Sequence, residues 1–206
     1  MNRFEIFKER KKSAIRNLLE AIKNNEVDKP IEKELLKINE YEIVYSTSSC
    51  AGRIALLVDK GNKKDSFFIG KWHEKVNAEE IIKSLKENIK NDLIWFKQEP
   101  FIIHLVFPKI KFARDVLKIA RDVGFKHSGI ISLKKEKIVL EVTGLDRIDF
   151  PIVINSELTI SLENFIKIVD LANSKMIRNA ILRQKFFNYF FEYLEKNSKK
   201  EVNLIV

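Results

Sequence analysis

Residues 46–59 read Ser-Thr-Ser-Ser-Cys-Ala-Gly-Arg-Ile-Ala-Leu-Leu-Val-Asp, so that a polar stretch runs directly into an apolar one. The nearly continuous apolar run over residues 53–59 predicts a buried β-strand, because a strand covered on both faces carries few polar residues. The hydroxyl side chains, the thiol and the glycine before it are expected to lie between this strand and an earlier, alternating strand at residues 41–46. This stretch therefore places a pair of strands in the first half of the chain.

Further elements extend from this stretch in both directions. On its N-terminal side, apolar residues at helical spacing predict an amphipathic helix over about residues 4–24, followed by a short helix over residues 30–36. On its C-terminal side the predicted strands are residues 66–71, 101–107, 130–133 and 137–143, with two short strands within 151–160. The predicted helices there are residues 78–89, 112–123 and 161–197, the last with Ser161 as its N-cap.

The order of these elements predicts an α+β fold. We expect a mixed sheet from two strand-rich halves packed with helices, a long C-terminal helix, and one domain over residues 1–206. Regular β-α-β alternation is missing, and no glycine-rich turn of the GxGxxG kind joins a strand to a helix. A Rossmann fold is therefore not expected, and any nucleoside cofactor must be held in another way.

The composition favours a globular protein with an excess of positive charge. The chain has 206 residues, 45% of them hydrophobic, and a formal net charge of +9, which favours binding to polyanions such as nucleic acids. A single cysteine excludes an internal disulfide and a cysteine-built zinc site. No apolar run approaches the ~20 residues of a membrane span, and the N-terminus has no signal-like segment. We expect a cytoplasmic location and no membrane partner.

The hydroxyl-rich stretch is the first candidate site. Ser48 and Ser49 offer hydroxyls, Gly52 allows a close approach to the backbone, and the guanidinium of Arg53 could hold a carboxylate or phosphate. The alternative is an ordinary polar hairpin, since serine, threonine and glycine are common in turns.

The histidines are the second set of candidates. His73 follows an aromatic strand, His104 lies inside an apolar strand, and His127 follows a predicted helix. A histidine in an apolar strand is more often a core residue than a catalyst, and the spacing fits no helical metal motif, so no metal is expected. The aromatic residues of the last helix could stack on bases, but their spacing favours core packing or a dimer contact.

Several short motifs occur together in a characteristic order. They are residues 47–53 (TSSCAGR), 100–104 (PFIIH), 124–130 (GFKHSGI) and 172–176 (ANSKM). With these motifs the chain closely resembles the wybutosine-synthesising methyltransferase family, the third enzyme of that pathway. His73 also falls where that family has a histidine, and Asp28 where it has an acidic residue, whereas His127 stands where the family usually has asparagine.

The resemblance implies a tRNA N-methyltransferase of wybutosine biosynthesis. Its expected reaction is N4-methylation of 7-aminocarboxypropyl-demethylwyosine at position 37 of tRNA(Phe), with S-adenosyl-L-methionine as methyl donor. The expected partner is the anticodon arm of tRNA(Phe), and the expected protein is a monomer or weak homodimer.

On this hypothesis the site residues divide into three groups that meet in one cleft. The catalytic candidates are His104, His73 and Asp28. The cofactor-binding candidates are Ser48, Ser49, Gly52 and Arg53. The RNA-binding candidates are His127, Ser128, Lys126 and Lys175. A basic surface that includes Lys118, Arg178, Arg183 and Lys185 would hold the anticodon arm, or would simply be a solvated helix face.

Three other functions are compatible with parts of the sequence. The first is a tRNA-binding paralogue of the same fold without catalytic activity, and calorimetry with the methyl donor would distinguish it. The second is a scaffold that dimerises through the phenylalanine-rich last helix. The third is a hydrolase built on Ser49 and His104, which lacks any local nucleophile motif.

Overall fold

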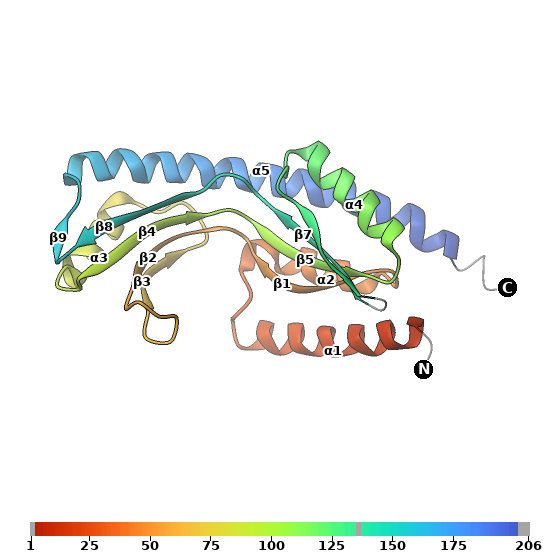
Figure 1. Cartoon of the computed structure of the whole chain (residues 1–206). Helices are drawn as coiled ribbons and strands as arrows, with labels where there is room; N and C mark the ends of the chain where they lie inside the picture. Colours follow the sequence, from red (N-terminus) through yellow and green to blue (C-terminus); the bar gives the residue numbers. More distant parts are fainter. Residues whose placement is uncertain (1–2, 135–136, 202–206) are drawn as a thin grey trace. The chain divides into compact units, whose positions relative to one another are not determined.

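The chain is divided into two compact units, each made of separated segments. The computed structural model describes residues 3–134 and 137–201 (Figure 1). Unit 1 contains Met1–Ala51, Phe101–Leu145 and Ile181–Val206, and unit 2 contains Gly52–Pro100 and Asp146–Ala180. The chain passes from one unit to the other four times, and one of these passages lies between Ala51 and Gly52, inside the hydroxyl-rich stretch.

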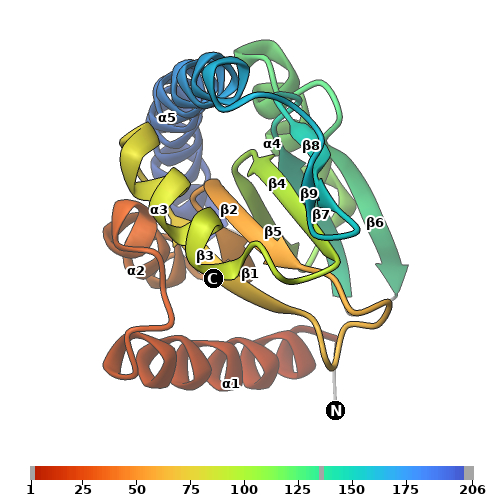
Figure 2. The same cartoon turned by 90° about the vertical axis from the view of Figure 1, so that its left-hand side faces the viewer.

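Unit 1 is built on a four-stranded antiparallel sheet. Its strands are β1 (Tyr45–Cys50), β5 (Ile102–Phe107), β6 (Gly129–Lys134) and β7 (Lys137–Thr143), in the spatial order β1-β5-β7-β6. Its helical elements are α1 (Arg3–Lys23), η1 (Lys29–Ile31), α2 (Glu32–Glu40), α4 (Ile110–Val123) and the second half of α5 (Leu162–Glu201). The helix α1 lies along one face of this sheet, and α4 lies over the other (Figures 1 and 2).

The strand residues of unit 1 alternate between these two faces. Ile103 and Leu105 on β5 point into the larger core, where Phe186, Phe187 and Phe190 of α5 are fully buried together with residues of α2 and α4. Val106 points to the opposite face and packs with Phe7, Tyr45 and Val139. This alternation places His104 on the same face as Val106, which is the face that α1 covers.

Unit 2 is built on a five-stranded antiparallel sheet. Its strands are β2 (Arg53–Val58), β3 (Phe67–Trp72), β4 (Leu93–Glu99), β8 (Ile148–Ile154) and β9 (Glu157–Leu158), in the order β3-β2-β4-β8-β9. Its helices are α3 (Ala78–Asn88) and the first half of α5. The core buries residues of β2, β4 and β8 against Ile81 and Leu85 of α3 and against Phe165, Val169, Ala172 and Met176 of α5.

The structure confirms the α+β class and the long C-terminal helix. Gly124 ends α4 with φ = 126°, as its position after the helical pattern predicted, and the hydroxyl of Ser161 accepts a hydrogen bond from the N–H of Asn164 at 3.3 Å. The predicted boundaries of most other elements agree with the structure to within a few residues. None of the described helices contains an apolar stretch of the length that a membrane span requires.

Three details of the prediction are wrong. The strand β4 was missed, although it lies between β2 and β8 in the sheet of unit 2. The strand predicted at residues 41–46 is β1 at Tyr45–Cys50, so that the hydroxyl residues are part of a strand and only Ala51 and Gly52 separate β1 from β2. Finally, the strands form two antiparallel sheets and not one mixed sheet, because every described strand pairing is antiparallel and none joins the two sheets.

Candidate active site

The hydroxyl-rich stretch of unit 1 contains a break in strand pairing. Ser46 pairs with Leu105 and Ser49 pairs with Ile103, so β1 has one more residue than β5 between these pairs. This β-bulge leaves Thr47 and Ser48 exposed, and such bulges often re-aim side chains at functional sites. Thr47, Ser48 and Ser49 line a cavity of about 460 Å³, whose other wall comes from α1 and from Glu26 and Val27.

The backbone that follows the bulge is held from two sides. The N–H of Ala51 donates a hydrogen bond to Oδ2 of Asp28 at 2.7 Å, and its carbonyl accepts one from Nη1 of Arg183, also at 2.7 Å. Burial lowers the pKa of Arg183, whereas the negative charges of Glu34 and Asp28 act in the opposite direction. Asp28 and Arg183 therefore hold the backbone of the TSSCAGR motif at Ala51. This contact suggests that Asp28 positions the motif and does not transfer a proton.

His104 forms a pair with a carboxylate on the neighbouring strand. It lies opposite Glu141 in the register of β5 and β7, and its Nε2 is 2.8 Å from Oε2 of Glu141. Both side chains are half-buried. An ionised carboxylate only accepts hydrogen bonds, so a neutral His104 ring must carry its proton on Nε2. The lone pair of the ring is then on Nδ1. This arrangement is typical of a general base whose orientation is fixed by a carboxylate.

In unit 2, Arg53 is held by a carboxylate and an aromatic ring. Its Nε donates to Oε2 of Glu99 at 2.6 Å, and its guanidinium lies 4.9 Å from the centroid of the Phe68 ring. Glu99 also accepts a hydrogen bond from Arg147 at 2.9 Å. These contacts use one edge of the guanidinium, and its terminal nitrogens keep the paired donor geometry that suits a carboxylate or phosphate.

His73 of unit 2 lies next to the backbone of Gly52. Its Nδ1 is 3.1 Å from the carbonyl oxygen of Gly52, which can only accept a hydrogen bond. The neutral ring therefore carries its proton on Nδ1 and its lone pair on Nε2. Gly52 itself is buried with φ = 94°, a conformation that side chains with a Cβ rarely adopt.

The predicted RNA-binding residues have different environments. Lys126 and His127 are exposed in the connection between α4 and β6. Ser128 is buried, and its hydroxyl accepts a hydrogen bond from the N–H of Thr143 at 3.2 Å, so it serves the fold. In unit 2, Lys175 forms an ion pair with Asp146 at 3.1 Å.

Each unit therefore contains part of the predicted set of site residues. Unit 1 holds Asp28, Ser48, Ser49 and His104 together with the exposed Lys126 and His127, whereas unit 2 holds Gly52, Arg53, His73 and Lys175. The expectation that all of them share one cleft stays a prediction.

Three partners of these residues were not identified from the sequence. Glu141 accepts from His104, Glu99 orients Arg53, and Arg183 binds Ala51. The only local signal for Glu141 is a charged residue within an apolar strand. Arg183 was assigned to a basic surface, but it is half-buried and bonded to the backbone.

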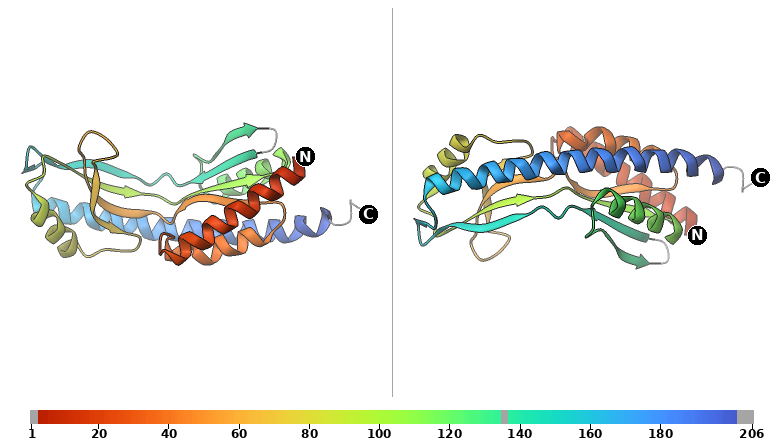
Figure 3. Two further views of the ribbon diagram at one scale, coloured as in Figure 1. Left: turned by 90° about the horizontal axis from the view of Figure 1, so that it is seen from below. Right: turned by 90° about the horizontal axis from the view of Figure 1, so that it is seen from above.

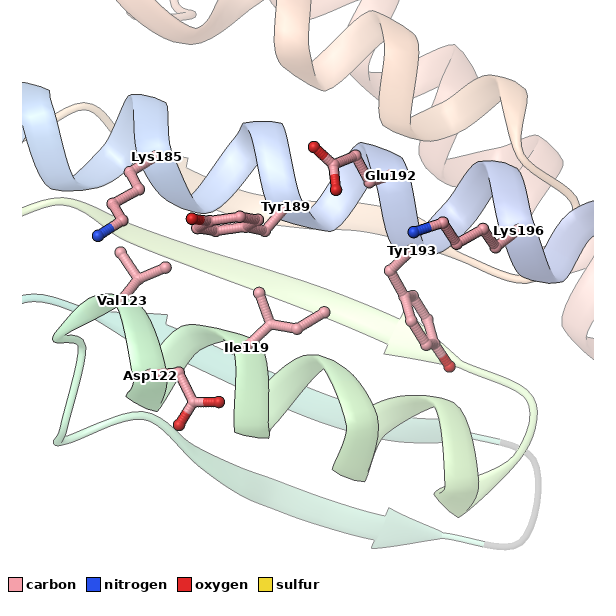
Figure 4. Close-up of a pocket in the computed structure, with 8 residues that line it drawn as sticks. All are labelled: Ile119, Asp122, Val123, Lys185, Tyr189, Glu192, Tyr193 and Lys196. Atoms are coloured by element: carbon pink, nitrogen blue, oxygen red, sulfur yellow. The ribbon is translucent and has the colours of Figure 1, made fainter.

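A further cavity of unit 1, of about 410 Å³, lies between α4 and α5 (Figure 4). The ring of Tyr189 lies along it opposite Ile119 and Val123, with Lys185 and Lys196 toward its two ends. Its lining also includes Asp122 and Glu192, so that two cations face two carboxylates. This balance of charge does not favour a polyanion. None of the catalytic, cofactor-binding or RNA-binding candidates lines this cavity, although Lys185 of the predicted basic surface does.

The aromatic residues of α5 mainly build the core. Phe186, Phe187 and Phe190 are fully buried and pack on one another, with ring centroids 5.4–5.6 Å apart for the pairs that include Phe186. The core-packing alternative is therefore correct for these three residues, and Tyr189 is the exposed member of the group.

Comparison with known proteins gives consistent matches over most of the chain. The family model described as Methyltransferase TYW3 matches residues 9–192. A relative from Thermococcus sibiricus is 34% identical over 170 residues, covering 82% of this chain and 86% of the relative, and one from Methanocaldococcus jannaschii is 32% identical over 186 residues, covering 88% and 95%. Both relatives are named tRNA(Phe) 7-((3-amino-3-carboxypropyl)-4-demethylwyosine(37)-N(4))-methyltransferase.

Solved structures show the same fold. The PH1069 protein from Pyrococcus horikoshii superposes with a TM-score of 0.84 at 31% identity, covering 92% of this chain and 98% of that protein. A protein from Aeropyrum pernix superposes with a TM-score of 0.68 at 26% identity, covering 83% and 99%.

Proposed function

Because this chain belongs to the Methyltransferase TYW3 family, we propose that it methylates N4 of 7-(3-amino-3-carboxypropyl)-4-demethylwyosine at position 37 of tRNA(Phe), with S-adenosyl-L-methionine as methyl donor. The observation that carries the proposal is the extent of the family match, which spans residues 9–192 and includes all four sequence motifs and every candidate site residue.

The chemistry of the available side chains fits a nucleoside cofactor. The amide of Gln98 in unit 2 is fully buried, and within the described part of the chain neither its nitrogen nor its oxygen has a hydrogen-bond partner. An unsatisfied buried group costs about 1–3 kcal/mol, so such groups usually have a functional reason. A primary amide offers a donor beside an acceptor, which matches the edge of an adenine.

The polar groups of the TSSCAGR motif fit the remainder of the cofactor. We assign the hydroxyls of Ser48 and Ser49 and the backbone of Gly52 to its polar edges. The terminal nitrogens of Arg53 would hold the cofactor carboxylate, with Glu99 and Phe68 fixing the guanidinium. When bound, S-adenosyl-L-methionine supplies an electrophilic methyl group on a sulfonium, so the protein mainly has to align the reactants and exclude water.

Methylation at nitrogen releases the proton that the acceptor nitrogen carried. We assign its removal to His104, because Glu141 fixes the ring with its lone pair on Nδ1. His73 is the second candidate, with its lone pair on Nε2. Asp28 is the weakest candidate of the three, since its carboxylate is bonded to the N–H of Ala51.

The exposed Lys126 and His127 would contact the anticodon arm from unit 1, and Lys175 would do so from unit 2. Ser128 would act indirectly, because its hydroxyl holds the connection that carries Lys126 and His127.

The proposal is tested by a methyl-transfer assay on tRNA(Phe) from a strain that lacks this gene, read by mass spectrometry of the nucleosides. We expect one added methyl group on the demethylwyosine nucleoside, and only when the methyl donor is present. If the folded protein binds this tRNA but adds no methyl group and gives no heat with S-adenosyl-L-methionine, the non-catalytic paralogue is the correct reading.

A further inference from the structure

The cavity beside Ser48 and Ser49 continues into a second cavity along α1. The second cavity has a volume of about 480 Å³ and shares Ala14, Asn17 and Thr47 with the first. Both belong to unit 1, and together they form one groove between α1 and the sheet, here named the α1 groove. Figures 1 and 3 show α1 running along this face of the sheet, with its first half beside the ends of β6 and β7. The groove therefore leads from these strand ends to the β-bulge.

The far end of the α1 groove is strongly basic. Arg10, Lys134 and Lys137 line it, and no carboxylate is among the residues that line this end. Within the described residues Lys134 and Lys137 form no ion pair, unlike Lys118 and Lys167, which pair with Asp122 and Glu163. Three cations gathered at one end of a groove attract an anion.

The two lysines are held opposite each other by the sheet. Lys134 on β6 and Lys137 on β7 are direct cross-strand partners. Like charges at such positions repel and destabilise the pairing, so the arrangement is unfavourable for folding alone. Within the described part of the chain, neither lysine forms an ion pair that would offset this repulsion. A bound anion would remove it.

Arg10 lies close to the same end of the groove. Arg10 and Tyr45 both line this end of the groove. Tyr45 itself is 2% exposed and packs against Phe7, so it fixes this wall. Arg10 itself is exposed at this end of the groove.

Neutral hydrogen-bonding groups lie between the basic end and the bulge. Ser13, Asn17 and Thr47 contribute hydroxyl and amide groups to the groove. Arginine, lysine, serine, threonine and asparagine side chains make most protein contacts to nucleic-acid phosphates, and a row of them along a groove suits a chain of phosphates better than a single ion. The elongated form and the sign of the charge both favour a polynucleotide backbone.

From these observations we propose that the α1 groove binds the phosphodiester backbone of the RNA substrate, with Arg10, Lys134 and Lys137 contacting phosphates and Asn17 and Thr47 guiding the strand toward Ser48 and Ser49. This inference rests on the proposed function and names a surface for its substrate. It also places the backbone contacts on α1 and on the β6–β7 pair, and not on the surface with Lys118 and Lys185, which the sequence analysis left open.

The test compares groove variants with variants of matched charge elsewhere. The groove variants are Arg10→Ala and the double variant Lys134→Ala/Lys137→Ala. Lys12→Ala is the control for the first, because Lys12 is on the same helix but forms an exposed ion pair with Glu9 and does not line the groove. Lys63→Ala/Lys64→Ala is the control for the second, because both residues are exposed in the loop before β3. Affinity for tRNA(Phe) from the deletion strain is measured over a series of KCl concentrations.

We expect both groove variants to bind this tRNA more weakly. The slope of log affinity against log salt concentration should also become smaller in magnitude, by about one for each lost phosphate contact. The controls should keep the slope of the wild-type protein, and all variants should keep its affinity for S-adenosyl-L-methionine. Arg10→Lys, which retains the charge, should restore most of the slope and thereby separate loss of charge from loss of folding.

Two results would contradict the groove. One is an unchanged affinity and slope in both groove variants, and the other is an equal loss in the controls, which would show only an effect of net charge. These results are independent of catalysis. If the wild-type protein methylates the tRNA and the groove variants bind it normally, the proposal that the α1 groove binds RNA is wrong and the methyltransferase proposal stands. A wild-type protein that never methylates, but whose binding depends on Arg10 and the two lysines, refutes the methyltransferase proposal and supports the groove.

Discussion

At the scale of single residues, the candidate site depends on polar groups held by partners from other elements. His104 is fixed by Glu141, Arg53 by Glu99, and the backbone of Ala51 by Asp28 and Arg183. Such fixed groups lose little freedom when a ligand binds, and this pre-organisation favours both affinity and rate.

The roles of His104 and Glu141 can be distinguished by the kinetics of their variants. For His104→Ala we expect kcat to fall by about 10²–10⁴, the usual contribution of a general base, with little change in tRNA affinity. Glu141→Gln keeps a hydrogen-bonding group but can present the ring with its wrong tautomer, so it should lower kcat less and change the pH profile of kcat. Single-turnover rates over a range of pH measure both effects. Full activity of His104→Ala would transfer the role to His73, for which His73→Ala is the matched comparison.

Cys50 is the one thiol of the chain and lies at the end of β1. Methylation at nitrogen needs no covalent adduct, because the nitrogen lone pair attacks directly. Cys50→Ser should therefore keep kcat within a few-fold of the wild-type value, provided that its circular dichroism spectrum is unchanged. A loss comparable to that of His104→Ala would indicate a covalent step.

Substitution of Gln98 by leucine should have opposite effects on the stability of the protein and on its affinity for S-adenosyl-L-methionine. Replacing its unsatisfied amide by a similar apolar side chain in Gln98→Leu removes a desolvation penalty, so the free energy of unfolding of the ligand-free protein should stay equal or rise by about 1–3 kcal/mol. Affinity for S-adenosyl-L-methionine should fall. Urea denaturation and calorimetry measure the two quantities, and unchanged affinity would exclude Gln98 from the cofactor site.

At the scale of elements, α1 is attached to the rest of unit 1 through a partly buried lysine as well as through Phe7. Lys11 donates hydrogen bonds to the carbonyl oxygens of Tyr41 and Val44, the latter at 3.0 Å, in the connection between α2 and β1. Burial lowers the pKa of Lys11 from 10.5 to about 8. The charged form is thus less favourable in the folded protein than in the unfolded chain.

This shift predicts how stability depends on pH. Between pH 8 and 10.5 the unfolded state binds more protons at Lys11 than the folded state does, so this residue's contribution to stability increases as the pH rises through that range and is lost as the pH falls through 8. Urea midpoints at pH 7.5, 9 and 10 should therefore rise in the wild-type protein relative to Lys11→Met. The difference between the two proteins cancels the opposing effect of tyrosines such as Tyr45, whose raised pKa lowers stability at high pH. Parallel curves would show that Lys11 titrates normally.

At the scale of the whole molecule, neither unit is a continuous stretch of chain. The core of unit 1 needs Phe186, Phe187 and Phe190 from the last segment, although the other segments of the unit end at residue 145. Unit 2 likewise joins residues 52–100 with residues 146–180. The long-range pairings within each unit make folding dependent on nearly the full chain.

A fragment of residues 1–145 should therefore not fold on its own. It lacks the three phenylalanines of the unit 1 core, each of which contributes about 3–5 kcal/mol on truncation to alanine, and it also lacks β8. We expect no cooperative urea transition and poor dispersion of its amide proton signals. Addition of the peptide of residues 146–206 should restore a transition if the two parts associate. A fragment that unfolds cooperatively by itself would show that α5 is dispensable.

The sequence determined most of the helices of this protein, and it determined its family. Helical periodicity placed α1, α3, α4 and α5, glycine and serine marked helix ends, and the order of the motifs indicated the methyltransferase family. These features depend on neighbouring residues, so local propensity and spacing are sufficient to predict them.

Only the tertiary structure decided which side chains meet. The β-bulge at Thr47 and Ser48, the pairing of His104 with Glu141, and the opposition of Lys134 to Lys137 all follow from strand register. The contact of Arg183 with Ala51 joins residues 132 positions apart. Register and long-range contacts are set by how whole faces of strands and helices pack, and a shift of one residue would turn every side chain of a strand to the other face.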